Sequence, residues 1–256
     1  MRRFYIAPEQ LLLPEPCLTG DEAKHILQVL RMAVGQDVFL FDNSGYEYRA
    51  RISALKGSRV CVEIMDRQYV PRESPLLLTL GLPLIRSQAL EWVLQKGTEL
   101  GVISFLPYYS ARSRRNFQKM KWDSRKGRWE KIILEAGKQC GRNSLPRLLE
   151  PVSFEQMMER GKGTPGIIPY EGESSRTLTG LELPFPLAGE LLALVGPEGG
   201  FEKEEIVLAE REGFIPFSLG PRILRSETAA LAIICLLQFL WGDMGSKRKG
   251  GIDALP

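Results

Sequence analysis

The chain has 256 residues, of which 44% are hydrophobic and 25% charged, a composition typical of a soluble globular protein with one or two domains. The net charge is only +3, so any nucleic-acid binding has to be inferred from how the charge is distributed. No apolar stretch reaches the roughly 20 residues that a membrane span needs, and the N-terminus lacks the apolar core of a signal peptide. We therefore expect a cytoplasmic protein.

Cysteine and histidine are too few and too scattered for a zinc site of the usual spacing, so we predict no metal. The single histidine, His25, also leaves little room for a Ser/His or Cys/His catalytic pair. The four cysteines (Cys17, Cys61, Cys140 and Cys235) lie far apart in apolar or helical surroundings, and we predict that all four are reduced thiols.

Residues 1–72 are predicted to form a small β-rich domain with one helix. Strand character is found at 38–41, at 46–52 after a turn at 42–45, and at 60–64. Thr19 is a candidate N-cap, with Glu22 three residues later, for a helix that continues to Met32. His25 lies in this helix beside its apolar face, where a histidine is usually structural. The alternative is that His25 and Arg31, with Arg2 and Arg3, face RNA phosphates.

A proline-bracketed linker at 69–75 is followed by a different type of domain. The continuous apolar run 76–82 is typical of a strand buried on both faces. A helix is predicted from Ser87 to Leu100, with Gly101 ending it, and the next strand covers 103–107.

The segment from Arg112 to Lys131 is strongly basic. It holds nine basic against two acidic residues, a net charge of +7 that exceeds the charge of the whole chain, and Trp122 and Trp129 are interleaved with them. Such a stretch suits phosphate binding and stacking of unpaired bases, while a solvated helix face is the alternative. A helix is expected from about Lys126 to Asn143.

The C-terminal part alternates strands, glycine-rich loops and helices. The strand 191–195 is followed by the loop Gly196–Gly200 and a helix that Gly213 ends; the strand 215–219 is followed by a loop at Gly220 and an apolar helix from Ala229 to Trp241. This order predicts a parallel α/β sheet with both loops at the carboxyl ends of strands, where such sheets bind ligands. The second loop is also compatible with an ordinary connection in which Ser226 is an N-cap.

The two loops resemble a known pair of motifs. Leu194-Val-Gly-Pro-Glu-Gly-Gly-Phe201 and Leu219-Gly-Pro-Arg-Ile-Leu-Arg-Ser-Glu-Thr-Ala229 are similar to those of the RsmE family, bacterial small-subunit ribosomal RNA methyltransferases of the SPOUT superfamily. P-loop and Rossmann dinucleotide motifs are missing from the sequence. The resemblance implies a C-terminal SPOUT-type α/β domain with a parallel sheet and a trefoil knot, at 73–245. It also implies a PUA-like RNA-binding β-barrel at 1–72; residues 246–256 are expected to be a basic flexible tail.

The resemblance further implies S-adenosyl-L-methionine as cofactor, N3 of a uridine in 16S ribosomal RNA of the small subunit as target, and a homodimer. The alternatives are a SPOUT methyltransferase acting on another RNA and a non-catalytic RNA-binding ribosome-assembly factor. The residues expected to hold the cofactor are Val195, Gly196, Glu198, Gly199, Gly200, Leu219, Gly220, Ile223, Leu224 and Thr228. Those expected to contact RNA are Arg2, Arg3, His25, Arg31, Arg112, Arg114, Arg115 and Lys119.

Methylation at N3 requires the uracil to lose a proton, so we expect a carboxylate base and a cation that stabilises the developing anion. Glu227 is the first candidate for the base, and Glu171 and Glu198 are the others. Arg225 is the first candidate for the cation, followed by Arg142. Each carboxylate could instead serve only to hold a loop by accepting backbone N–H bonds.

Overall fold

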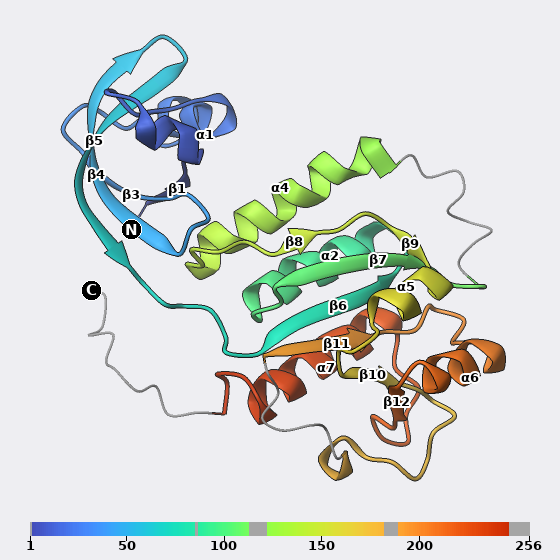
Figure 1. Cartoon of the computed structure of the whole chain (residues 1–256). Coiled ribbons are helices and arrows are strands. Elements are labelled where there is room, and N and C mark those ends of the chain that lie inside the picture. Colours follow the sequence, from blue (N-terminus) through green and yellow to red (C-terminus); the bar gives the residue numbers. More distant parts are fainter. Residues whose placement is uncertain (1, 85–86, 113–121, 182–188, 246–256) are drawn as a thin grey trace. The chain divides into compact units, whose positions relative to one another are not determined.

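The computed structural model describes residues 2–84, 87–112, 122–181 and 189–245, and the chain divides into two compact units (Figure 1). The first unit contains Met1–Glu73 together with Leu134–Leu145, and the second contains Ser74–Ile133 together with Pro146–Pro256. A domain boundary at residue 72 would assign the segment Leu134–Leu145 to the second domain. In the structure this segment groups with the first unit.

The first unit is built on a five-stranded sheet with the order β1-β3-β4-β5-β2, which curls around its core (Figure 1). Its strands are β1 (Arg3–Tyr5), β2 (Cys17–Leu18), β3 (Asp37–Phe41), β4 (Tyr46–Lys56) and β5 (Arg59–Tyr69). β1 pairs with β3 in parallel and the other pairs are antiparallel. The predicted turn joins β3 to β4, with Gly45 at a φ of 87° that glycine adopts without strain. Alternate side chains of β4, from Tyr48 to Ile52, point into the core.

The first unit also contains three short helical segments: a 3₁₀ turn at Pro8–Leu12, α1 (Gly20–Lys24) and a π-helical turn at His25–Val29. The expected capping box is wrong, because the Thr19 side chain makes no capping hydrogen bond. Glu22 is instead buried and accepts a hydrogen bond of 2.8 Å from Lys138. Burial raises the pKa of the Glu22 carboxyl, an effect that Lys138 opposes.

The prediction of four reduced thiols is wrong for one pair. Cys17 and Cys61 face each other in the register of β2 and β5, and they are joined by a disulfide. Their pairing follows from strand register, which cysteine spacing in the sequence does not reveal. Cys140 and Cys235 are not part of this disulfide.

The second unit contains a parallel sheet with the order β12-β10-β11-β6-β7-β8, and β9 also pairs with β7 in parallel. Its strands are β6 (Leu77–Pro83), β7 (Ser104–Tyr109), β8 (Arg147–Leu148), β9 (Val152–Ser153), β10 (Gly166–Pro169), β11 (Glu190–Leu194) and β12 (Phe214–Phe217). β11 is inserted between β10 and β6, so the chain crosses the sheet more than once. The predicted parallel α/β domain is confirmed.

Helices cover the sheet, with α2 and α7 behind it and α5 in front in Figure 1. They are α2 (Ser87–Glu99), α4 (Trp122–Cys140, shared between the two units), α5 (Phe154–Arg160), α6 (Lys203–Arg211) and α7 (Ser226–Leu240), with a 3₁₀ turn at Leu178–Gly180. α2 ends at Glu99, one residue before the predicted end at Leu100, and Gly101, the predicted stop residue, has a φ of 89°. Among the described residues, no helix combines the length and the apolar character needed to cross a membrane.

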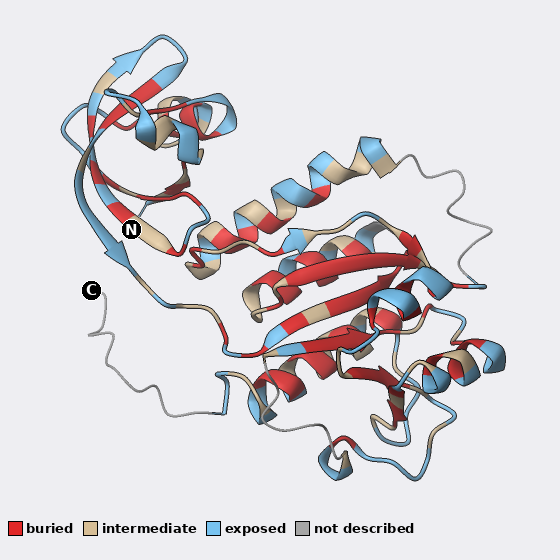
Figure 2. Cartoon of the chain, viewed as in Figure 1, coloured by how far each residue is buried: buried red, intermediate tan, exposed pale blue. Residues whose placement is uncertain are grey.

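Burial explains why these segments fold as they do (Figure 2). Leu191 to Leu194 are buried throughout, as expected for a central parallel strand that is covered on both faces. One polar residue interrupts the apolar part of α7 that follows Thr228: Gln238 is buried, and its amide oxygen accepts a 2.6 Å hydrogen bond from the Ser74 hydroxyl. This bond satisfies the amide oxygen of Gln238, while its buried Nε2 has no hydrogen-bond partner among the described residues.

Candidate active site

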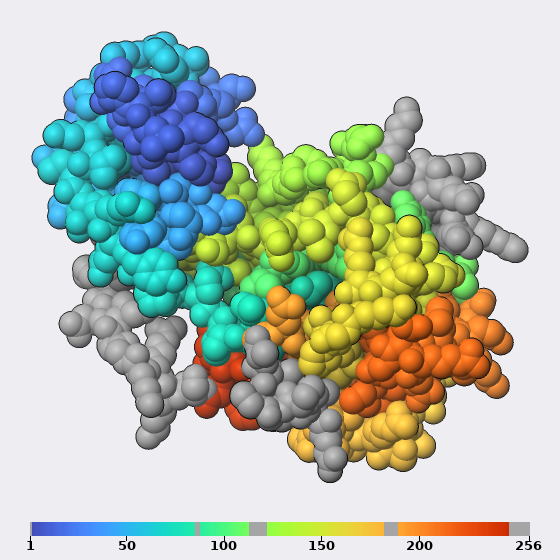
Figure 3. All heavy atoms as spheres, in the orientation of Figure 1, coloured from blue at the N-terminus to red at the C-terminus, as the bar shows by residue number. Residues whose placement is uncertain are grey.

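The candidate site lies where β10, β11 and β12 end. Because β10 runs parallel to both of its neighbours, the loops that follow these strands emerge at one edge of the sheet. The loop after β10 and the loop after β12 line a pocket of about 460 Å³, and in Figure 3 the amber segment after β10 lies against the orange segment around β12. The residues that line it are Pro169, Tyr170, Glu171, Glu173, Ser174, Thr177, Ser218, Leu219, Gly220, Pro221, Arg222, Ile223, Leu224 and Ala229.

The pocket therefore contains four of the predicted cofactor residues, Leu219, Gly220, Ile223 and Leu224. Gly220 has a φ of 103°, and space is open around its Cα, so the backbone here is accessible to a ligand. Ile223, which also lines the pocket, is 88% exposed.

The loop after β11, Val195–Gly200, does not line the pocket but contacts its walls. A Cβ at Gly200 would clash with a carboxylate oxygen of Glu171, one of the pocket residues. Gly200 also has a φ of 72°, so glycine is needed there both for space and for backbone conformation. Glu171, which follows β10 by two residues, is thereby placed between the two glycine loops.

Side chains from three other parts of the second unit donate hydrogen bonds to carbonyl groups of this loop. The Tyr108 hydroxyl, from β7, donates to the Val195 carbonyl at 2.6 Å. The Ser226 hydroxyl, at the start of α7, donates to the Gly196 carbonyl at 2.6 Å. The guanidinium of Arg112 donates to the Gly199 carbonyl.

Complete burial raises the pKa of the Tyr108 phenol well above its usual range, and the negative charge of Glu205 adds to the effect. The phenol is therefore a permanent donor at neutral pH. Glu205 itself is buried in the first turn of α6, where its carboxylate accepts the N–H groups of Glu202 and Ala111, both at 2.9 Å. Glu202 is the N-cap of α6, and its side chain completes the capping box.

The candidate catalytic pair lies at the start of α7. Arg225 is the N-cap residue and is exposed, while Glu227 is half-buried in the first turn and Thr228 is exposed. The alternative reading of Ser226 as an N-cap is wrong, because Ser226 is the first residue inside the helix and its hydroxyl bonds to Gly196 instead. The second glycine loop is thus tied directly to the first.

The sequence of this chain matches two described domain families. An RNA methyltransferase PUA domain matches residues 18–65, and an RNA methyltransferase domain matches residues 72–238. Ribosomal RNA small subunit methyltransferase E of Bacillus subtilis is 31% identical over 248 residues, which cover 93% of this chain and 96% of that protein. The chain belongs to the ribosomal RNA small subunit methyltransferase E family.

Solved structures of methyltransferase E relatives have the same fold. The Neisseria gonorrhoeae enzyme, bound to S-adenosyl methionine, superposes with a TM-score of 0.84 at 32% identity, covering 95% of this chain and 99% of that one. A Legionella pneumophila protein described as a methyltransferase in complex with the bound cofactor SAM gives a TM-score of 0.84 at 34% identity, covering 94% and 98%. The resemblance inferred from the two loop motifs is confirmed.

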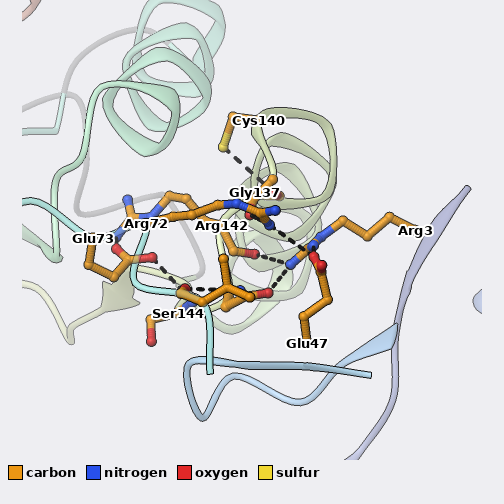
Figure 4. A network of polar contacts seen from close by, with 11 residues as sticks. Arg3, Glu47, Arg72, Glu73, Gly137, Cys140, Arg142 and Ser144 are labelled. Carbon is orange, nitrogen blue, oxygen red and sulfur yellow. Dashed lines mark hydrogen bonds and ion pairs between the residues drawn. The ribbon is translucent and has the colours of Figure 1, made fainter. Parts of the chain in front are cut away.

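Arg142, the second candidate for the catalytic cation, belongs to the first unit of this methyltransferase E relative. Its side chain is buried, and its guanidinium is ion-paired with Glu73 (Figure 4). The same network contains Arg3, which pairs with Glu47 and donates to the Arg142 carbonyl at 2.9 Å. Both guanidinium groups are therefore held by carboxylates of the first unit and are not available to stabilise a uracil anion.

The remaining RNA-binding candidates differ in exposure. Arg2 and Arg31 are exposed, and Arg31 has a φ of 49°, an uncommon conformation for a residue other than glycine. His25 is half-buried, and its ring makes an edge-to-face contact with the Phe4 ring at a centroid distance of 6.0 Å. Arg112 is exposed beside the first glycine loop. Arg114, Arg115 and Lys119 lie outside the described residues.

Sequence reasoning did not identify Tyr108, or the contact of Ser226 with Gly196. One signal was available for Tyr108, because a tyrosine in a buried strand needs a partner for its hydroxyl. The partner itself is 87 residues away in the sequence, and no local pattern indicates it. The same holds for Glu173, which lines the pocket from the loop after β10.

Proposed function

We propose that this chain transfers a methyl group from S-adenosylmethionine to N3 of a uridine in 16S ribosomal RNA of the small subunit, in the cytoplasm. The observation that carries the proposal is the pair of glycine loops joined by Ser226 beside a pocket at the carboxyl edge of the sheet. Relatives with the same fold hold S-adenosyl methionine and act, by name, on small-subunit ribosomal RNA.

The residues present fit the proposed cofactor. A pocket of about 460 Å³ lies within the range of small-molecule sites, roughly 300–1,000 Å³. Its wall at Leu219–Leu224 offers main-chain groups, and Gly220 leaves them uncovered by a side chain. We propose that this wall and the loop Val195–Gly200, with Glu198 and Thr228, hold the cofactor. When bound, S-adenosylmethionine supplies an activated methyl group on a sulfonium centre.

The chain's own residues would position the base and move its proton. Uracil N3 carries a proton that has to leave before the nitrogen can attack, and Glu227 at the start of α7 is the proposed acceptor. Glu171 is the strongest alternative, because it lines the pocket and touches the first glycine loop. Glu198, on that loop, is the third candidate. Arg225 would stabilise the negative charge that develops on the uracil carbonyl oxygens.

We propose that RNA is bound by basic side chains in both units. Arg2, His25 and Arg31 serve in the first unit, and Arg112 serves in the second together with Arg114, Arg115 and Lys119 of the basic segment. The local charge of +7 between Arg112 and Lys131 would supply most of the affinity through counterion release. Binding should therefore weaken steeply as salt is raised.

We further propose that the enzyme is a homodimer and that α7 contributes to the interface. Leu236, Phe239 and Leu240 form one exposed apolar face of this helix, with Phe239 61% exposed. A second copy is the occupant we propose, because contiguous exposed apolar side chains are a feature of protein–protein contacts. Sedimentation of the wild-type chain and of Phe239→Lys tests this: a wild-type dimer that the substitution dissociates supports the proposal, and a wild-type monomer refutes it.

The reaction is tested by methyl transfer. Labelled S-adenosylmethionine would be incubated with unmethylated small subunits and, separately, with free 16S RNA, and the product nucleoside identified by mass spectrometry. N3-methyluridine is the expected product. Another methylated nucleoside would indicate a different RNA target or atom, and a chain that fails to bind S-adenosylmethionine would be a non-catalytic RNA-binding factor.

A further inference from the structure

Two buried hydroxyl groups hold consecutive carbonyl groups of the first glycine loop. Tyr108 is completely buried, and its hydroxyl donates to the Val195 carbonyl; Ser226 is 5% exposed, and its hydroxyl donates to the Gly196 carbonyl. Both bonds are 2.6 Å long, which is at the short end for a hydroxyl donor. The donors come from β7 and α7, two elements that are far apart in the sequence.

These two hydrogen bonds involve the residues that directly follow the end of strand β11. β11 ends at Leu194, and the Val195 N–H makes a last backbone bond of 3.0 Å to the Gly81 carbonyl. Beyond this point the loop contains Gly196, Gly199 and Gly200, which have more backbone freedom to lose than other residues. Without side-chain donors, nothing in the strand pairing would fix the direction of the Val195 and Gly196 carbonyls.

The Ser226 bond also joins the two loops. Ser226 lies two residues after the segment Leu219–Leu224 that forms one pocket wall, and its acceptor belongs to the other glycine loop. The Ser226 hydroxyl therefore links the loop that contains Gly196 to the pocket wall Leu219–Leu224. Both backbone segments would have to hold the same ligand. Such preorganisation raises affinity by lowering the ordering cost of binding.

We propose that Tyr108 and Ser226 are positioning residues that hold the Val195–Gly196 segment in its cofactor-binding conformation. Tyr108 fixes the loop to the sheet, and Ser226 fixes it to the loop after β12. Neither residue takes part in the chemistry. This inference rests on the proposed function, since it assigns the two loops to S-adenosylmethionine.

The competing explanation is that both hydroxyls merely satisfy buried carbonyls. Two matched controls distinguish the explanations, because each removes a buried hydroxyl bond that is remote in sequence from these loops. In the first unit, the Tyr48 hydroxyl donates to Asp42 at 2.9 Å, so Tyr48→Phe matches Tyr108→Phe. In α2, the Thr98 hydroxyl donates to the Leu94 carbonyl at 2.7 Å, so Thr98→Val matches Ser226→Ala.

The experiment measures two quantities on the full chain: the Kd for S-adenosylmethionine by titration calorimetry and the melting temperature. We expect Tyr108→Phe and Ser226→Ala each to raise the Kd about tenfold, equivalent to one lost buried hydrogen bond. The controls should lower the melting temperature comparably and leave the Kd within about twofold. Ser226→Thr, which keeps the hydroxyl, should recover most of the affinity, and turnover at saturating cofactor should fall less than about threefold in every variant.

A melting temperature that falls while the Kd stays at the wild-type value would overturn the inference, because the hydroxyls would then be structural only. Ser226→Ala decides the question if Tyr108→Phe fails to fold. Absence of S-adenosylmethionine binding by the wild-type chain is a separate result: it refutes the proposed function, and this inference with it.

Discussion

Two groups of arginines in this protein have opposite surroundings. In the first unit, Arg3 and Arg142 are withdrawn from solvent and their guanidinium groups are ion-paired with Glu47 and Glu73. In the second unit, Arg222 and Arg225 are exposed beside the pocket, and neither forms an ion pair with any described residue. The first group is held by carboxylates of its own unit, while the second is exposed to solvent, where a ligand could reach it.

The comparison shows why residue type and motif do not assign a role. Arg142 and Arg225 were both candidates for stabilising the uracil anion, yet Arg142 is buried, while Arg225 is exposed next to the pocket residue Leu224. Burial lowers the pKa of Arg3 from its usual value, and the Glu47 carboxylate opposes that effect, as expected for a charge that is stabilised by its partner rather than by water. A buried arginine of this kind supports the fold, and its loss should affect stability first.

The largest effect is expected for Arg225→Ala, on catalysis. If Arg225 stabilises the developing anion, its removal should lower kcat/KM for methyl transfer by about 100-fold or more, since a single donor of this type contributes that much. The melting temperature should not change, because the side chain is exposed. Arg211→Ala, at an exposed position on α6, is the matched control and should retain full activity. Full activity of Arg225→Ala would instead remove the catalytic role.

The fold was largely predictable from local patterns. Apolar runs and the glycines at 45 and 101 located the strands, turns and helix ends, because strand burial and left-handed backbone conformations leave marks in a few adjacent residues. The meeting of the loops after β11 and β12 also followed, since parallel strands end at one edge. These sequence patterns involve residues that are close together in the chain, which is why the sequence alone reveals them.

The parts that could not be predicted depend on contacts between distant residues. Arg142 meets Glu73 across 69 residues, and Arg3 meets Arg142 across 139. The disulfide between Cys17 and Cys61 depends on the register of two strands. No local pattern distinguishes an arginine that will find a buried carboxylate from one that will remain exposed.

The second expected effect is on stability, from Arg3→Ala. Removing one partner of a buried ion pair leaves the Glu47 carboxylate short of a counter-charge, so the free energy of unfolding should fall by about 3 kcal/mol. Arg72 also donates to Glu47, at 2.9 Å, and limits the loss. Denaturant unfolding measures the change, with Arg49→Ala as control, because Arg49 pairs with Asp37 at the surface. Equal stability of the two variants would mean that the buried network contributes no more than an exposed pair.

The smallest effect concerns the exposed arginines of the first unit, Arg51 and Arg49, whose hydrogen bonds lower the pKa of the Asp37 carboxyl. Because the folded-state pKa is below the unfolded value, the associated stabilisation is present above the usual pKa of aspartate and is lost as pH falls through the lowered value. Arg51→Ala should return the pKa of Asp37 toward its usual value, as measured by NMR titration of the carboxyl carbon. Added salt should do the same in the wild-type chain, since exposed charges are screened. A pKa that neither the substitution nor salt moves would show that these surface bonds are not formed in solution, and the contrast with the buried arginines would then be sharper still.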